Sequence, residues 1–187
     1  ATTDVGNGVI DMDTLAVDGT VALTTNGNGA ATVVNDAGIE FAASTVRGAL
    51  SATATTGNIT QSGALTITGT TTLVTSANDA TIALSNTSNA FTGALTITTN
   101  VASGTEADAT IDGGTTALII AASTIDGNLT LTSGHASGIT DSGTVTVGGN
   151  LIATTNANNG VINLGDLEVN GTIALTTHSG GAATVVN

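Results

Sequence analysis

The chain has 187 residues, with 14 acidic residues, a single arginine (Arg47) and no lysine, which gives a formal net charge of -13. This charge argues against nucleic acid and anionic membrane surfaces as partners, because both are bound through Lys and Arg. The absence of Cys excludes disulfides and thiolate metal sites, and no apolar run reaches the ~20 residues of a membrane helix.

The composition indicates a β-protein with a core of small aliphatic side chains. Apolar residues make up 40% of the chain, mostly Val, Ile, Leu and Ala, whereas aromatic residues make up 1%. A disordered chain would be less hydrophobic, and a compact globular core would contain more aromatic residues. β-branched residues suit pleated surfaces, so stacked strands fit better than either alternative.

The first 35 residues of the chain return near its end. Residues 153–187 repeat residues 1–35 at an offset of 152, with 22 of the 35 positions identical. Self-similarity at a fixed period is the signature of solenoids and repeat arrays. We therefore divide the chain into one long repeat (1–152) and the start of the next (153–187), without a true domain boundary, and expect a window of a longer array.

A nine-residue motif recurs within the long repeat, with apolar and polar positions alternating around a central residue. In chain order the motif covers residues 15–23, 44–52, 65–73, 95–103, 123–131, 145–153 and 167–175. The central residues are Gly19, Gly48, Gly69, Thr99, Gly127, Gly149 and Gly171. We therefore count six short units in each long repeat.

Each motif predicts two short strands. The positions two before and two after the centre are almost all apolar, as in Val46 and Leu50, and alternation places them on one face. The central glycine permits a bend or a positive φ between the strands. A polar turn and a third apolar segment follow in most units, such as Ile82–Leu84. Three short strands per unit of about 20–30 residues predict a parallel β-helix (β-solenoid), with a string of β-sandwich domains as the alternative.

The segments GALTITGTTTL, GALTIT and GNLTLTSG resemble the coils of filamentous-haemagglutinin-type adhesins and of the giant bacterial β-strand-repeat surface proteins. This resemblance covers nearly the whole chain. It implies a right-handed parallel β-helix, secretion to the cell surface, and a role in adhesion or as a fibre. It carries over no functional residues.

Three pairs of acidic residues at i, i+2 are the candidates for chemistry: Asp11/Asp13, Glu106/Asp108 and Asp166/Glu168. Two carboxylates on one strand face could serve glycoside hydrolysis or hold Ca²⁺. A site built into the repeat should recur, but Asp11/Asp13 become Asn163/Gly165 in the second copy. We therefore predict no catalytic, cofactor-binding or metal-binding residues, and leave only Ca²⁺ open as a cofactor.

The remaining chemistry-bearing residues also favour a protein that is not an enzyme. His135 and His178 follow the same strand position in different units and are predicted turn residues. A polysaccharide lyase would need Arg or Lys for its acidic substrate, and only Arg47 is present. The many Ser and Thr residues lack the His/Asp partner pattern of nucleophilic catalysis.

We expect a structural segment of a long extracellular fibre or cell-surface adhesin. Its expected partners are further copies of the repeat, end to end, and a cell-surface or glycan contact, without nucleic acid or membrane insertion. Neither end carries a capping coil, so we expect the chain to polymerise. The alternatives are an adhesin module with receptor contacts in loops 77–90 and 104–116, a polysaccharide-acting enzyme, and an ice-binding face of outward threonines such as Thr96/Thr98.

Overall fold

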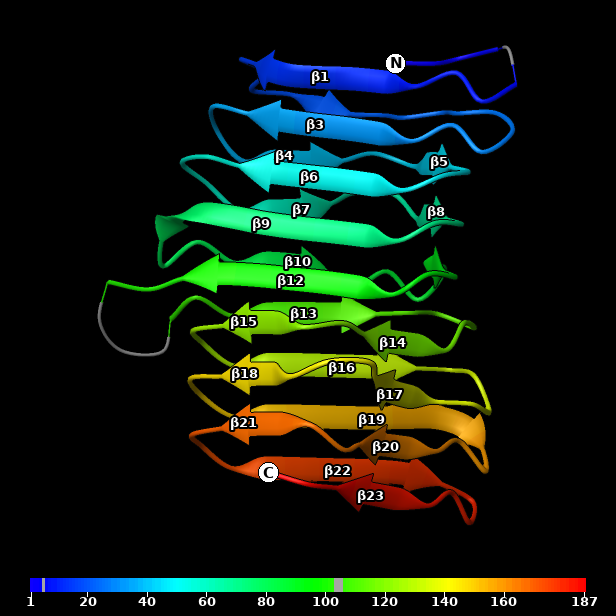
Figure 1. Cartoon of the computed structure of the whole chain (residues 1–187), viewed down its shortest axis with the longest axis vertical. Coiled ribbons are helices and arrows are strands. Elements are labelled where there is room, and N and C mark those ends of the chain that lie inside the picture. The colour runs from blue at the N-terminus through cyan, green and yellow to red at the C-terminus, as the bar shows by residue number, and fades with distance from the viewer. Residues whose placement is uncertain (5, 103–105) are drawn as a thin grey trace.

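The structure is a computed structural model that describes residues 1–4, 6–102 and 106–187. Its coils stack into a rod of about eight turns. In Figure 1 the chain descends from the N-terminus, with the near strands running to the left and the far strands to the right, which is a right-handed winding. The predicted all-β, right-handed parallel β-helix is confirmed. The described residues include no helix that is long and apolar enough to cross a membrane.

Sheet I has 12 strands and forms one long side of the rod. It begins with a single row, β1 (Ile10–Leu15), β3 (Ala31–Asn35), β6 (Leu50–Ala54), β9 (Thr71–Asn78) and β12 (Leu95–Asn100). After β12 it continues as two rows. One row is β14 (Leu118–Ile120), β17 (Ile139–Asp141), β20 (Ile162–Leu164) and β23 (Ala183–Val185). The other row is β15 (Ser123–Ile125), β18 (Val145–Val147) and β21 (Leu167–Val169).

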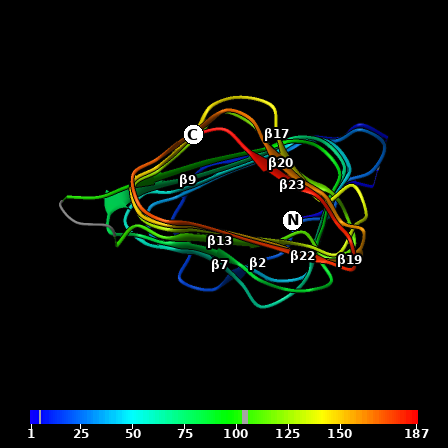
Figure 2. The same cartoon turned by 90° about the horizontal axis from the view of Figure 1, so that it is seen from below.

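Sheets II and III complete the coils. Sheet II contains β2 (Thr20–Val21), β4 (Ile39–Phe41), β7 (Ile59–Gln61), β10 (Ile82–Leu84), β13 (Ala109–Asp112), β16 (Leu129–Ser133), β19 (Leu151–Asn158) and β22 (Ile173–His178). Sheet III contains β5 (Ser44–Val46), β8 (Leu65–Ile67) and β11 (Ala90–Phe91). Figure 2 looks along the axis and shows a flattened outline, with β9 of sheet I on one long side and β13 and β22 of sheet II on the other.

The long repeat contains seven coils, whereas the motif predicted six units. The path along sheet I from β1 to β20 consists of seven parallel pairings, and it connects Ile10 with Ile162, its counterpart 152 residues later. The motif undercounts because its centres lie at two different corners of the coil. Gly48 and Gly69 precede strands of sheet I, whereas Gly19, Gly127, Gly149 and Gly171 precede strands of sheet II, so some intervals between centres exceed one coil. The remaining centre, Thr99, lies within the long strand β12, so the described part of the unit at 95–103 contains no corner. The corner of that coil is at Gly93, which stacks on Gly69. Residue 103 lies outside the described residues.

Stacked inward-facing side chains form the core. In sheet II, for example, Ile39, Ile59 and Ile82 are aligned in successive coils and are at most 1% exposed. The predicted inward positions of the motif, such as Val46 and Leu50, are buried as well. Because coils are only about 4.8 Å apart, each side chain packs directly on its neighbours above and below.

Most glycines at the motif centres are needed for close packing between coils, whereas Gly19 stands in open space. The amide of Gly69 donates to the carbonyl of Gly48 at 3.0 Å, and a Cβ on Gly69 would lie 2.5 Å from the Gly48 carbonyl carbon. Of the two predicted possibilities, the glycine centres show the bend and not the positive φ. Among the described glycines, a positive φ occurs at Gly27, Gly114, Gly138 and Gly180.

The chain contains two copies of a ten-strand unit, β3–β12 and β13–β22. Their strands are 5, 3, 3, 5, 3, 3, 8, 3, 2 and 6 residues long in the first copy and 4, 3, 3, 5, 3, 3, 8, 3, 3 and 6 in the second. Equivalent strands occupy opposite sides, since β6 and β9 belong to sheet I and their counterparts β16 and β19 to sheet II. Two units fill seven coils, so the second unit is turned by half a turn relative to the first.

Individual hydrogen bonds support this equivalence. Ser44 Oγ accepts from the amide of Leu23 (3.0 Å) and donates to the carbonyl of Ala42 (2.8 Å). Ser123, its counterpart in the second unit, makes the same two bonds to Ile97 (3.0 Å) and Ala121 (2.7 Å). Both serines are nearly buried, so each fixes the bend before its strand in the same way.

Candidate functional site

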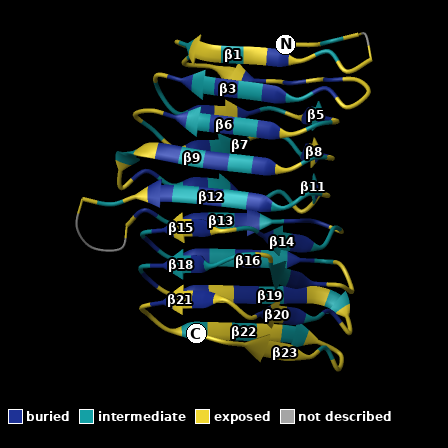
Figure 3. Ribbon diagram, in the orientation of Figure 1, coloured by how far each residue is buried: buried dark blue, intermediate teal, exposed yellow. Residues whose placement is uncertain are grey.

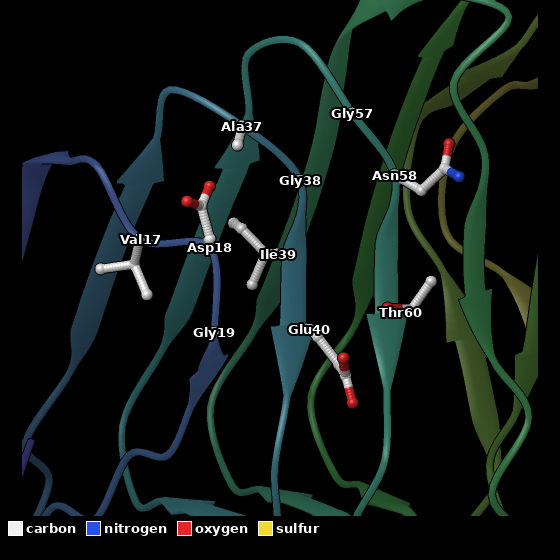
Figure 4. Close-up of a pocket in the computed structure, with 10 residues that line it drawn as sticks. All are labelled: Val17, Asp18, Gly19, Ala37, Gly38, Ile39, Glu40, Gly57, Asn58 and Thr60. Atoms are coloured by element: carbon white, nitrogen blue, oxygen red, sulfur yellow. The ribbon is translucent and has the colours of Figure 1, made fainter.

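A groove of about 350 Å³ follows the corner between sheets I and II in the first three coils. It is lined by Val17, Asp18, Gly19, Ala37, Gly38, Ile39, Glu40, Gly57, Asn58 and Thr60 (Figure 4). Its volume is at the lower end of the range of small-molecule sites. Three successive corner segments form it, so the groove runs along the rod axis.

The groove exists because small residues occupy this corner. Gly19 has nothing within 4 Å of the place where a Cβ would stand. Asn35, which is 1% exposed, holds the corner from inside through its side chain. Its Oδ1 accepts from the amide of Val17 (3.0 Å), and its Nδ2 donates to the carbonyls of Val17 (2.9 Å) and Gly38 (2.6 Å). Asn187 bonds in the same way to Val169 in the next repeat, at 2.6 Å to its amide and 3.3 Å to its carbonyl.

The groove does not assemble a recognisable catalytic arrangement. Its two carboxylates, Asp18 and Glu40, are exposed and point in different directions in Figure 4. Its lining contains no histidine, lysine or arginine. Position 18 is also an asparagine, Asn170, in the second copy of the sequence. The arrangement offers polar contacts around an apolar floor and no pair of converging titratable groups.

The three acidic pairs are placed on separate parts of the surface. Asp11 and Asp13 are exposed on β1. Asp166 and Glu168 are exposed and accept hydrogen bonds from the hydroxyls of Thr144 (3.0 Å) and Thr146 (3.1 Å) in the preceding coil. These bonds connect adjacent coils, which is a structural task.

The two residues of the pair Glu106/Asp108 differ in exposure to solvent. Glu106 is exposed, while Asp108 is half-buried and its Oδ1 accepts from the amide (2.7 Å) and the side-chain nitrogen (2.9 Å) of Asn128. Among the described residues, no three His, Cys, Asp or Glu side chains lie close enough together to hold a metal ion. The structure thus explains Asp108 as a link between coils.

The histidines lie at the ends of strands on the surface. His135 is exposed in the turn after β16, and its Nδ1 accepts from the amide of Ser137 at 3.0 Å, as predicted for a turn residue. His178 is instead the last residue of β22. The hydrogen bond of His135 stays within its own turn, so it is accounted for locally.

The two segments predicted as receptor-binding loops each contain a strand of the β-helix. Segment 77–90 contains β10, and Asn89 inside it is 1% exposed. Asn89 accepts from the amide of Leu65 (2.9 Å) and pairs with the side chain of Gln61 through two bonds (2.8 and 2.9 Å). In segment 104–116, residues 104 and 105 lie outside the described residues, and β13 occupies the middle.

Two uncharged surfaces lie on the rod, and the sequence pattern indicates only their outward threonine pairs Thr96/Thr98 and Thr130/Thr132. Face I is the outward side of β3, β6, β9 and β12, formed by Thr32, Val34, Ser51, Thr53, Thr72, Val74, Thr96 and Thr98. Face II is the outward side of β16, β19 and β22, formed by Thr130, Thr132, Ile152, Thr154, Ala174 and Thr176. Figure 3 shows the strands of face I as alternating buried and intermediate residues. None of these seven strands contains Asp, Glu, Lys or Arg.

Comparison with known proteins reveals one family. The sequence model described as repeats of unknown function (DUF5649) matches residues 28–98 and 106–176. These two matches contain β3–β12 and β13–β22, up to the last residues of β12 and β22, so each corresponds to one ten-strand unit. Searches for similar curated proteins and for similar solved structures found no match.

Proposed function

Because the chain belongs to the family of DUF5649 repeats and forms one continuous solenoid, we propose that it is a segment of a long extracellular fibre or cell-surface adhesin. The repeat solenoid supports a structural role. The likeness of its coils to filamentous-haemagglutinin-type adhesins supports a place at the bacterial surface. A single Arg and no Lys leave one trypsin-type cleavage site, which suits a protein exposed to proteases.

One observation carries the proposal: the long repeat passes into the next without an interruption. Strand β19 (Leu151–Asn158) runs across the point where the second copy begins, at Ala153. The first strands of each copy then pair in the same register, Ile10 with Ala31 and Ile162 with Ala183. Further copies can therefore be added through the same backbone ladder, without a new type of interface.

The proposed mechanism is mechanical. Coil-on-coil hydrogen bonds run along the axis and give stiffness, and the number of repeats sets the length. Seven coils at about 4.8 Å advance the rod by roughly 34 Å per long repeat. The partners are further copies end to end, together with a cell-surface or glycan contact. The proposal includes no catalytic activity, because the three acidic pairs lie on separate parts of the surface, and Asp11/Asp13 and Asp166/Glu168 are not repeated in the other copy of the sequence.

Electron microscopy of the native material, with averaging along the filament, tests this function. We expect a thin continuous rod with an axial spacing of about 4.8 Å and a longer period of roughly 34 Å. Beads on a string, or compact separate particles, would overturn the proposal. A period near six coils, roughly 29 Å, would instead contradict the pairing along sheet I.

A further inference from the structure

We propose that faces I and II are lateral contact surfaces, through which a second copy of this chain packs side by side with the first. The inference goes beyond the proposed function, since it concerns how rods associate sideways. It depends on the solenoid fold and not on the proposed location at the cell surface. The occupant is another copy of the same surface, so the contact is isologous.

The distribution of charge carries the proposal. The chain has a net charge of -13, yet the strands of both faces lack acidic residues. Acidic residues lie beyond the edge of each face, at Asp11 and Asp13 on β1 next to face I and at Asp112 on β13 next to face II, so the uncharged areas span four and three coils. The opposite sides carry Glu40 and Glu168. Packed sheets are about 10 Å apart, close to the screening length of ~8 Å at physiological salt. Two acidic sides would therefore repel at contact distance, whereas two uncharged faces would not.

The side chains of the faces are suited to sheet-on-sheet packing. Face I presents only Ser, Thr and Val, which are short and partly apolar, in rows that repeat at every coil. On face II, Ile152 is 44% exposed. It is the one large hydrophobic residue in the described chain that is both this exposed and located away from the first and last ten residues. An apolar side chain in this position gains from being covered.

The size of the faces sets the expected strength. Face I measures about 17 Å along its strands and about 19 Å across four coils, which is roughly 300 Å². A stable pair usually needs about 800 Å² from each partner. A single face therefore gives a weak contact, and strong lateral association requires many faces in one rod acting together.

The half-turn between the two ten-strand units decides the form of the assembly. Face I lies on sheet I and face II on sheet II, and β6, β9 and β12 of face I correspond to β16, β19 and β22 of face II, so these equivalent strands point to opposite sides of one rod. Strand β3 has no counterpart in face II, because the corresponding strand β13 carries Asp112. A rod can then contact one neighbour on each side. The expected product is a flat ribbon of parallel or antiparallel rods, not a closed pair.

Cysteine crosslinking tests the proposal in the 187-residue chain, which has no natural Cys. Ser51→Cys places a thiol on face I, and Thr60→Cys places one on the opposite side, next to Glu40. Both positions are half-exposed. A short bismaleimide spans the ~10 Å between packed sheets. End-to-end stacking leaves either thiol several coils from its counterpart, so it contributes to neither rate.

We expect Ser51→Cys to form crosslinked dimers about tenfold faster than Thr60→Cys, a factor that corresponds to ~1.4 kcal/mol of preference. Adding Thr72→Asp, beside Ser51, should reduce its rate to that of Thr60→Cys, with folding verified by circular dichroism. Equal rates for the two cysteines would overturn the proposal. The rate difference between the two cysteine variants should persist in roughly 1 M salt, where screening acts within about 3 Å. If it disappears there, the proposal is overturned, because the difference then came only from repulsion at the acidic side and not from attraction at face I.

Discussion

At the scale of single residues, Thr71 stands out in the core. It is 1% exposed, lies between Leu50 and Leu95 in a column of inward side chains, and its Oγ1 has no hydrogen-bond partner within the described chain. A buried hydroxyl without a partner costs free energy. The equivalent position in the second ten-strand unit is Leu151, so this column accepts an apolar residue.

We predict that Thr71→Val raises the free energy of unfolding by about 1 kcal/mol, because it removes the unpaired hydroxyl at nearly constant volume. Thermal unfolding would show a melting temperature higher by roughly 2–4 °C. Thr25→Val is the matched control, since buried Thr25 Oγ1 donates to Gly29 (2.7 Å) and accepts from the amide of Arg47 (2.9 Å). The control should be destabilised, and a stabilised control would refute the explanation.

The residue-level pattern could be predicted in part. The inward positions were visible because Val46, Leu50 and their counterparts alternate with polar residues. The role of Asn89 could not be foreseen, since it bonds to Gln61 and Leu65, 28 and 24 residues earlier. Such contacts depend on the length of the coil between the partners, which the local sequence does not reveal.

At the scale of elements, the corners decide whether coils can stack. Gly69→Ala places a Cβ 2.5 Å from the Gly48 carbonyl carbon and 2.6 Å from the Ala49 amide. Both are backbone atoms and cannot rotate away, so we expect a loss of about 1–3 kcal/mol. Gly19→Ala, at an open position, should stay within about 0.5 kcal/mol of the parent. Urea unfolding of both variants measures the difference, and equal losses would contradict the packing explanation.

The strands themselves were predictable, but the coil count was not. The nine-residue motif marks a corner at Gly48 and Gly69, where two short strands meet. The same pattern at 95–103 falls on the long strand β12, because alternation looks alike in one long strand and in two short ones. The candidate groove was also not foreseen, since it is formed by three corners about 20 residues apart that become neighbours only in the folded rod.

At the scale of the whole molecule, the rod should resist proteolysis. Arg47 is the only target for trypsin, and it lies at the corner between β5 and β6, with its amide bonded to Thr25. Cleavage requires this corner to open, and opening is rare in a stable ladder. We expect trypsin to cleave the folded chain slowly and the chain in urea rapidly, giving fragments 1–47 and 48–187. Electrophoresis at successive times measures the two rates. Equal rates in both conditions would show that this corner is not held in the ladder.

The half-turn between the ten-strand units also constrains how a gene for such an array can change in length. Gain or loss of one unit would rotate every later surface to the opposite side of the rod. Gain or loss of two units would preserve the orientation of all later surfaces. Recombination that keeps the surfaces aligned must therefore proceed in steps of two units, which is the interval of 152 residues at which the opening of the chain recurs with 22 of 35 residues unchanged.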